Sequence, residues 1–558
     1  MELSPSEEEQ EAAAPGALST ALVGDSLTVA LWTIVSRVMG FVKVATIAAV
    51  LGPTYLGNTF QALNSLPNLL SYGFLAGALF PSLLVPPLVR HIDASDARTT
   101  HRLAGGFLGV AILSFGLVAA AAVVAGPLVL QALSAGVEDS TLAAAQHRVG
   151  WPLLVMLMPQ VVFYGIAGTA AAVMNAHSRF ALPAAAPALE SIGVAGTMVA
   201  YALLFGTGTE LEDVGSAQLL LLGLGTTAAV GVHAGVQWIG ARRAGVTLVP
   251  RAGWRDPEVR EVLRRAVPST GYGGLAALQF FGSLVVANSV RGGVVAFQLA
   301  WNLVTLPTAL AGRPVGSALL PQLARIHHAG GRRHFRDELV RGIRLTLFLV
   351  VPAAMAYVAL ASPLARSVSF GEMATSTGVA LLATVLVALA PSLVGESCVV
   401  VATNASYAQR DVHSPFVAML LQTLVALAGM ALALALEGTA TLLTLGLSLS
   451  VATFVSSGYL MLRMRSRLPV SGEPLIAPLA RILVASVAMV GPAYFVAVFV
   501  PEAVGGRWAH LVGMLLASIV GVVIFVGVER LWRSEELTVL VAGFRQLPSS
   551  LSKKSPSP

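Results

Sequence analysis

The chain has 558 residues, of which 56% are hydrophobic and only 11% are charged, and its mean hydropathy is +0.79. Soluble domains carry about 25% charged residues, so this composition excludes a water-soluble globular protein, and the apolar content excludes a disordered chain. Cys398 is the single cysteine, which excludes a disulfide scaffold. The sequence therefore predicts an all-α polytopic membrane protein. In a membrane protein, a net charge of +6 informs on the orientation of the loops rather than on nucleic-acid binding, so we expect no nucleic-acid partner.

A transmembrane helix needs about 20 mostly apolar residues, and about fourteen such segments are predicted along the chain. The acidic residues 1–21 lack the basic start and the cleavage site of a signal peptide, so we expect a disordered N-terminal tail. The predicted spans are residues 26–50, 58–89, 103–132, 149–174, 180–206, 215–240, 264–288, 293–322, 342–362, 374–403, 414–436, 440–462, 478–501 and 508–529.

Basic residues are distributed unevenly over the loops between these spans. The great majority of the 34 Lys and Arg residues lie in the loops after even-numbered spans and near the C-terminus. The basic residues in the loops on the opposite side are only Arg148, Arg291, Arg366 and Arg507. Because basic loops stay in the cytoplasm, both termini and the even loops are predicted to be cytoplasmic, including the tail at 531–558.

Two predicted spans contain a similar pattern of prolines. Residues from Leu66 read LPNLLSYGFLAGALFPSL and residues from Leu306 read LPTALAGRPVGSALLPQL, with the same spacing between their prolines. The offset of six spans is even, so two pseudo-symmetric six-helix lobes would insert with the same orientation around a central cavity. Chance similarity in Leu- and Pro-rich segments is the alternative. Residues expected to bend these helices are Pro67, Gly73, Gly77, Pro307, Gly312 and Gly316.

This repeat defines the predicted organisation of the chain. The N-lobe covers 22–241, a basic cytoplasmic linker 242–263, the C-lobe 264–467, and two extra C-terminal spans 468–530. The linker contains Trp254 among arginines, which favours contact with anionic lipids at the membrane surface. A docking site for a partner protein is the alternative for this segment.

Five charged residues lie in the interior of predicted spans, away from the span ends. Arg37, Lys43 and Arg313 are basic, and Glu190 and Glu396 are acidic. A charge at mid-bilayer costs about 2.5–3.5 kcal/mol, so such residues usually face a cavity or a partner. Guanidinium groups suit phosphate oxygens, so the three cations are candidates for binding an anionic diphosphate headgroup. The alternatives are pairing of Arg37 or Lys43 with Glu190 or Glu396, or snorkelling to the interface.

Sequence signatures of enzymes are absent. The chain contains no P-loop, no HExxH, no GxSxG and no Cys/His metal cluster, and its loops are short. We therefore expect no enzymatic activity, no cofactor and no metal site. His233 is interpreted as a packed polar residue rather than a proton relay.

Several motifs occur in the order typical of one family. They are SRVMGFVK, LPNLL with GALFPSL, NAHSRFALPAAAP, LVTLP with GSALLPQL, and YAQRDVHSP. Together they resemble the MurJ/MviN family of lipid II flippases, within the multidrug/oligosaccharidyl-lipid/polysaccharide exporter superfamily. The resemblance implies a protein of the bacterial inner membrane that serves peptidoglycan biosynthesis and cell shape. Such a protein moves undecaprenyl-diphosphate-linked lipid II from the inner to the outer leaflet by alternating access, without ATP.

The chain departs from the family pattern at several charged positions. Asn58 and Asn302 stand where the family has charged residues, and they join Glu190 and Glu396 as candidates for ion coupling or for polar contacts in the cavity. The other replacements are Lys43, Val44, Ser71, Tyr72, Ala76 and Trp301.

These departures leave the cargo open. The alternatives to lipid II are another polyprenyl-linked glycolipid or an amphiphilic metabolite. A drug antiporter of the related MATE type and a transport-inactive membrane scaffold for cell-envelope enzymes are the rival functions. The expected partners are a lipid-linked substrate, membrane lipids and cell-wall synthesis proteins.

Overall fold

The computed structural model describes residues 15–75, 84–469, 475–506 and 508–542. The first group of helices, the N-lobe, comprises α2 (Pro15–Leu51), α3 (Tyr55–Leu75), α4 (Val85–Asp93), α5 (Ala97–Val124), α6 (Gly126–Leu133), α7 (Ser140–Leu157), α8 (Pro159–Ala176), α9 (Ala181–Phe205), α10 (Ser216–Leu220), η2 (Leu221–Gly225) and α11 (Thr226–Arg243). The C-lobe follows the short turn η3 (Gly253–Arg255) and comprises α12 (Pro257–Asn288), α13 (Gly293–Pro307), η4 (Thr308–Gly312), α14 (Arg313–His328), α15 (Arg332–Ala359), α16 (Ala361–Val368), η5 (Gly371–Ala374), α17 (Ser376–Leu389), α18 (Ser392–Ala408), α19 (His413–Ala433) and α20 (Thr439–Arg465). The last helices are α21 (Ile476–Val504) and α22 (Ala509–Leu531).

The helices agree with the predicted membrane spans. Within the described residues, 11 helices are long and apolar enough to cross a membrane, and α17 with α18 makes 12 if this pair, bent by 42°, forms one span. The bend falls where Pro391 follows the end of α17, because proline cannot continue the backbone hydrogen bonding of a helix. The remaining two predicted spans, 58–89 and 264–288, coincide with α3 plus α4 and with α12. The predicted fourteen spans are therefore consistent with the structure.

The turn at the end of α8 repeats at the end of α18. Ser178 and Arg410 both have positive φ angles, of 55° and 60°, which non-glycine residues rarely adopt. The amide of Arg179 donates to the carbonyl of Met174, and the amide of Asp411 donates to the carbonyl of Ser406. Both turns therefore close by the same hydrogen bond, and each lies in a motif on which the family resemblance depends.

Helix pairing repeats as well. In the N-lobe, α8 packs on α5 and α11, and α9 packs on α11. In the C-lobe, α18 packs on α15 and α20, and α19 packs on α20. The pairs correspond after a shift of six spans, so the two lobes are parallel repeats of one arrangement, as the proline pattern predicted.

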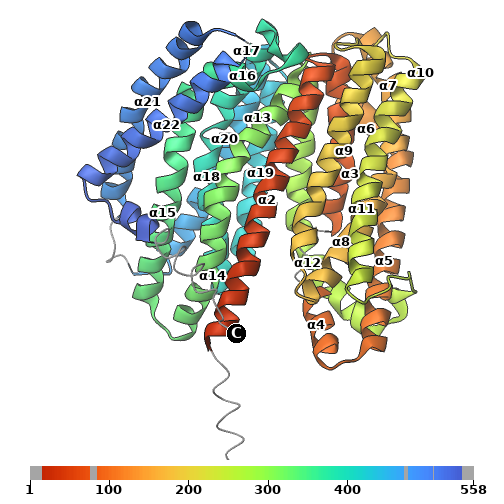
Figure 1. Ribbon diagram of the computed structural model, residues 1–558, viewed down its shortest axis with the longest axis vertical. Helices are drawn as coiled ribbons and strands as arrows, with labels where there is room; N and C mark the ends of the chain where they lie inside the picture. Colours follow the sequence, from red (N-terminus) through yellow and green to blue (C-terminus); the bar gives the residue numbers. More distant parts are fainter. Residues whose placement is uncertain (1–14, 76–83, 470–474, 507, 543–558) are drawn as a thin grey trace, which may run out of the picture.

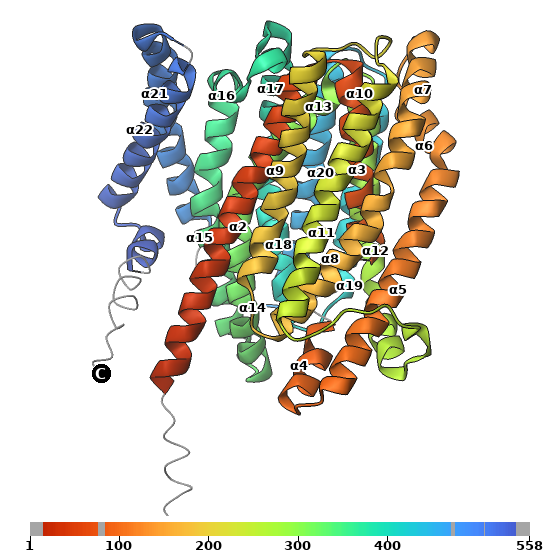
Figure 2. The same ribbon diagram turned by 45° about the vertical axis from the view of Figure 1, so that its right-hand side comes forward.

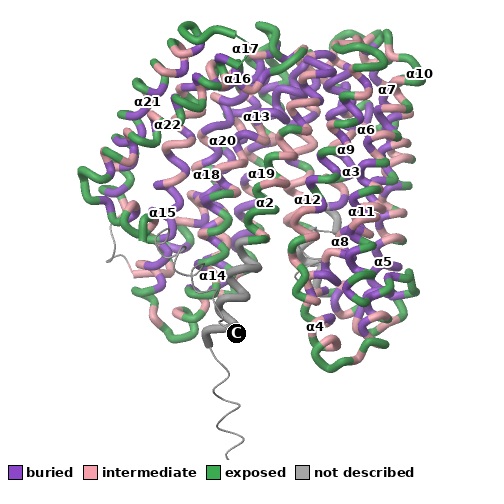
Figure 3. The backbone as a smooth tube through the Cα atoms, viewed as in Figure 1, coloured by how far each residue is buried: buried purple, intermediate pink, exposed green. Residues whose placement is uncertain are grey.

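The two lobes share a core at one end of the molecule only. One cluster of buried side chains joins Leu51 and Phe60 of the N-lobe to Phe297 and Leu386 of the C-lobe. Toward the opposite end, each lobe has a core of its own. Figures 1 and 3 show this arrangement, with α4 and α14 lying apart at the lower end and the buried backbone running through each lobe. We call the lower end, which carries the turns at Ser178 and Arg410 and the linker, the basic end.

The predicted linker packs on α5 and is shorter than expected. The amide of Arg251 donates to the carbonyl of Gly105, and a Cβ added at Gly109 would lie 1.9 Å from the carbonyl oxygen of Arg251. Helix α12 begins at Pro257, inside the segment predicted as linker, because the Asp256 side chain accepts the amide of Glu258 and caps it.

The extra helices α21 and α22 stand against the outside of the C-lobe (Figure 2), where α21 contacts α15 and α22 contacts α16. Beyond α22, a buried ionic cluster anchors the chain. Arg344 on α15 donates to Glu536 at 2.7 Å, and Arg481 on α21 lies 3.0 Å from Glu529 of α22. These contacts hold the C-terminal pair to the C-lobe.

Asp411 stabilises the chain directly after the turn at Arg410. It accepts the amides of His413 and Ser414 at the start of α19 and pairs with Arg467. Burial raises the pKa of Asp411, but the hydrogen bonds from Ser414 and Arg467 outweigh it and hold the pKa at about 2, below its usual 3.8. Its stabilising effect is therefore complete above about pH 4 and is lost as the pH falls through about 2.

We expect Asp411→Ala to lower the free energy of unfolding by about 1–2 kcal/mol at pH 7. Asp411→Asn should lose less, because asparagine also caps helices. Thermal unfolding of the detergent-solubilised protein at pH 7 measures both changes. Equal stability of Asp411→Ala and the wild type would contradict the capping role.

Candidate functional site

A cavity of about 440 Å³ lies among the inner helices and is lined mainly by the C-lobe. Helices α12, α13, η4, α14 and α18–α20 supply most of its walls, and the N-lobe contributes Arg37 on α2 and Leu69 on α3. The cavity is therefore bounded by both repeats, as the predicted central cavity requires.

Two of the three predicted cations line this cavity. Arg37 and Arg313 reach it from opposite lobes, and both side chains are exposed. Glu396 lines the same cavity, and Arg313 lies near enough to Glu396 and Tyr272 to interact electrostatically with both. Two positive charges beside one carboxylate leave the cavity able to hold an anionic group.

Arg313 follows an irregular turn of helix. Residues Thr308–Gly312 form a π-helical segment directly after Pro307, and π segments often mark functional sites. A Cβ at Gly316 would lie 2.7 Å from Nδ2 of Asn404, so α14 approaches α18 closely at this glycine. On the other repeat, Pro67 lies inside α3 and Gly73 near its end, whereas Gly77 lies outside the described residues.

Polar side chains that sequence reasoning missed complete the cavity. Gln279 and Gln422 line it, and their Oε1 atoms are buried without a hydrogen-bond partner among the described residues. Such oxygens accept hydrogen bonds, so they suit a headgroup rich in hydroxyl or amide donors. Glutamines in apolar spans were the available signal, because a buried polar group in a membrane needs a partner.

Two aromatic rings form part of the cavity wall. Trp301 packs edge-on against Phe280, with ring centroids 5.5 Å apart, and both rings line the cavity. The neighbouring Asn302 is absent from the lining, and its side chain donates to the carbonyl of Gln298 on the same helix.

Lys43 lies in a separate network in the N-lobe. Its Nζ is 3.4 Å from Oε1 of Glu190, which also accepts from the hydroxyl of Tyr164 at 3.1 Å. The other carboxylate oxygen lies 3.1 Å from Nδ1 of His233. The pairing of Lys43 with Glu190, one of the alternatives left open above, is thus present, and neither residue lines the cavity of Arg37 and Arg313.

Asn58 joins the lobes rather than lining the cavity. Its Nδ2 donates to the carbonyl of Val290 at 2.8 Å, and its Oδ1 accepts the amide of Val294 at 3.0 Å. One helical turn along, Gln298 donates to Ser65 at 2.7 Å. These inter-lobe hydrogen bonds lie within the shared core, so they help to seal the end of the molecule opposite the basic end.

Removing the hydrogen bonds of Asn58 should open the sealed end. Asn58→Ala loses two buried hydrogen bonds, or about 1–3 kcal/mol, which would raise the population of the opened state roughly tenfold. A cysteine can be introduced at the cavity residue Ser283 in a Cys398→Ala background. If the sealed end opens, an impermeant maleimide added from that end should label this cysteine faster. Thr46→Ala is the control, because its hydroxyl donates only to Val42 on its own helix. Equal labelling rates in both variants would contradict the sealing role.

Two repeated helical lobes that are sealed at one end and enclose a cationic cavity define a polytopic membrane transporter. A family model described as lipid II flippase MurJ matches residues 47–538. The chain therefore belongs to the MurJ family.

Relatives and solved structures agree with this assignment. A probable lipid II flippase MurJ of Rhizobium meliloti is 28% identical over 347 residues, which cover 62% of this chain and 63% of the relative. A lipid II flippase MurJ of Burkholderia cenocepacia is 26% identical over 401 residues, covering 70% of this chain and 74% of the relative.

Among solved structures, a lipid II flippase MurJ in an inward closed conformation superposes with a TM-score of 0.70 at 16% identity, covering 91% of this chain and 98% of that one. An inward-facing MATE family transporter of the MOP superfamily gives a TM-score of 0.61 at 14% identity, covering 78% of this chain and 98% of that one. These two similarities support the fold.

Proposed function

We propose that this protein is a flippase for lipid II, the undecaprenyl-diphosphate-linked precursor of peptidoglycan. The cavity that receives Arg37 and Arg313 from opposite lobes is the observation that supports this function most. A diphosphate carries enough negative charge to engage both guanidinium groups, and the amide oxygens of Gln279 and Gln422 can accept hydrogen bonds from sugar or peptide groups.

The transport step follows from the two-lobed arrangement. With the shared core sealing one end, the headgroup would enter the cavity from the basic end while the lipid tail stays in the membrane. Rocking of the lobes would then break the contacts around Asn58 and expose the headgroup at the other end. No step in this cycle requires ATP.

Membrane potential supplies a driving force for the return step. Moving one charge across the membrane is worth about 2.3 kcal/mol per 100 mV. When the cavity is empty, the membrane potential would pull its two positively charged arginines toward the negative side of the membrane. Glu190 and Glu396 are the acidic residues through which an ion could couple to this cycle.

We place the protein in the bacterial inner membrane with the basic end and both termini in the cytoplasm. The distribution of Lys and Arg over the loops supports this orientation. The transport direction is then from the inner to the outer leaflet, and the protein acts as a carrier rather than a catalyst.

Complementation tests the cargo. The chain would be expressed in a bacterium whose own lipid II flippase can be depleted, and survival after depletion is the expected result. Lysis despite confirmed membrane expression would contradict lipid II as the cargo and favour another polyprenyl-linked glycolipid. Failure to move any lipid, with a stable complex of cell-wall synthesis proteins, would favour the scaffold function.

A further inference from the structure

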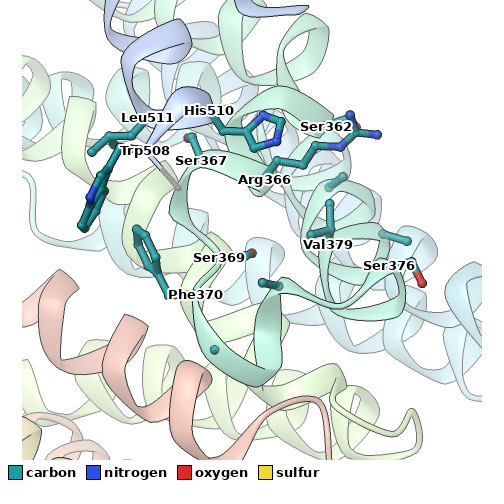
Figure 4. A pocket seen from close by; sticks show the side chains of 14 residues that line it. Ser362, Arg366, Ser367, Ser369, Phe370, Ser376, Val379, Trp508, His510 and Leu511 are labelled. Atoms are coloured by element: carbon teal, nitrogen blue, oxygen red, sulfur yellow. The ribbon is translucent and has the colours of Figure 1, made fainter. Parts of the chain in front are cut away.

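A second cavity opens at the end of the molecule opposite the basic end. It has a volume of about 660 Å³ and is bounded by α16, η5, α17 and the start of α22 (Figure 4). The extra C-terminal helices thus form one wall of this cavity, and the C-lobe forms the others. It shares no lining residue with the cavity of Arg37 and Arg313.

The cavity is basic. Arg366 on α16 and His510 on α22 line it from separate elements, and Figure 4 shows the guanidinium group of Arg366 extending past the ring of His510. The lining contains no carboxylate. Neither Arg366 nor His510 has a hydrogen bond or an ion pair among the described residues. A guanidinium with no acidic neighbour at a membrane surface favours an anionic ligand.

A buried hydroxyl provides an independent indication of a ligand. Ser369 is only 6% exposed, and its Oγ has no hydrogen-bond partner within the described part of the chain. Figure 4 places this oxygen among the side chains that line the cavity. Buried polar atoms in native proteins are nearly always hydrogen-bonded, so the hydroxyl of Ser369 is available to a bound group.

The surroundings indicate that this ligand is a lipid. Trp508 and Phe370 line the cavity with ring centroids 6.2 Å apart, and tryptophan prefers the membrane–water interface. From the lining residue Leu511, the same face of α22 continues through Leu515 and Ile519, which are 58% and 59% exposed. An acyl chain could follow this apolar face while the headgroup occupies the cavity.

We infer that this cavity binds the phosphate headgroup of an anionic lipid, with Arg366 and the Ser369 hydroxyl as its ligands. The proposed orientation places this site at the outer leaflet. The inference that the site binds an anionic lipid does not rest on that orientation. The bound lipid would bridge α16 and α22 and so attach the C-terminal helices to the C-lobe at this end, as the ionic cluster around Arg344 does at the basic end.

Native mass spectrometry of the purified full-length protein can test this site. Phosphatidylglycerol and phosphatidylcholine would be titrated separately, and free inorganic phosphate would be added as a competitor. Arg366→Gln should weaken binding of one phosphatidylglycerol molecule about tenfold, because it removes a charge-assisted hydrogen bond. Ser369→Ala should weaken the same binding event to a smaller degree. This second variant keeps the test valid if Arg366→Gln misfolds.

Arg148→Gln is the matched control. Arg148 is also an arginine of the end opposite the basic end, but it donates to the backbone carbonyl of Glu212 and lies outside the cavity. Its substitution should leave lipid binding unchanged. Equal loss in Arg148→Gln, unchanged binding in both cavity variants, or equal binding of phosphatidylcholine would each overturn the inference. Displacement of the lipid by millimolar phosphate would show a site for free phosphate instead. None of these outcomes depends on transport of lipid II.

Discussion

Replacing Arg313 with alanine is expected to abolish complementation and to lower the rate of lipid II transport by about 10–100-fold. A hydrogen bond to a charged group is worth about 1.5–3 kcal/mol, and the guanidinium group can form two to a diphosphate. Arg37→Ala should have a similar effect, because Arg37 reaches the same cavity from the other lobe. Flipping of a fluorescent lipid II analogue in proteoliposomes measures both rates.

The geometry of the arginines gives a finer prediction. Arg313→Lys keeps the charge but loses the planar fork, so it should restore only part of the transport rate. Arg325→Ala is the matched control on the same helix, since among the described residues Arg325 donates only to the carbonyl of Pro321, and it lies outside the cavity. Full transport by a stably expressed Arg313→Ala or Arg37→Ala variant would refute the proposed headgroup site.

The architecture could be predicted from sequence because it depends on local patterns. Apolar length locates most spans, and the matched prolines at Pro67 and Pro307 revealed the repeat that helix pairing confirms. The bend between α17 and α18 was not predicted, because the apolar pattern continues across Pro391 without a break. The early start of α12 depends on a cap at Asp256, which a hydropathy window does not detect.

The candidate site could be predicted only in part. Arg37 and Arg313 stood out as charges within spans, and they do line one cavity. Lys43 carried the same signal, but its partner depends on which helix packs beside α2. That helix is α9, which carries Glu190, and not α18, which carries Glu396. Sequence patterns show which face of a helix is polar but not which helix it meets, so the alternatives for Lys43 could not be separated.

The Lys43–Glu190 pair leads to the second large prediction. Glu190 is only 8% exposed, and its carboxylate is shared by Lys43, Tyr164 and His233. In Glu190→Gln the Lys43 ammonium keeps its charge but loses its counter-charge within the membrane. Breaking one half of a buried ion pair costs about 3–5 kcal/mol, so this variant should unfold at a clearly lower temperature.

The double variant separates loss of the pair from loss of the carboxylate itself. Lys43→Met removes the unpaired charge and keeps an unbranched side chain, so Lys43→Met with Glu190→Gln should recover much of the lost stability. Thermal unfolding of the four proteins in detergent completes the cycle, and additive effects would contradict a direct interaction. A stable double variant also isolates function. If it still flips lipid II, the pair holds α2 against α9. If it folds but no longer responds to proton or sodium gradients, the Lys43–Glu190 pair takes part in coupling transport to an ion.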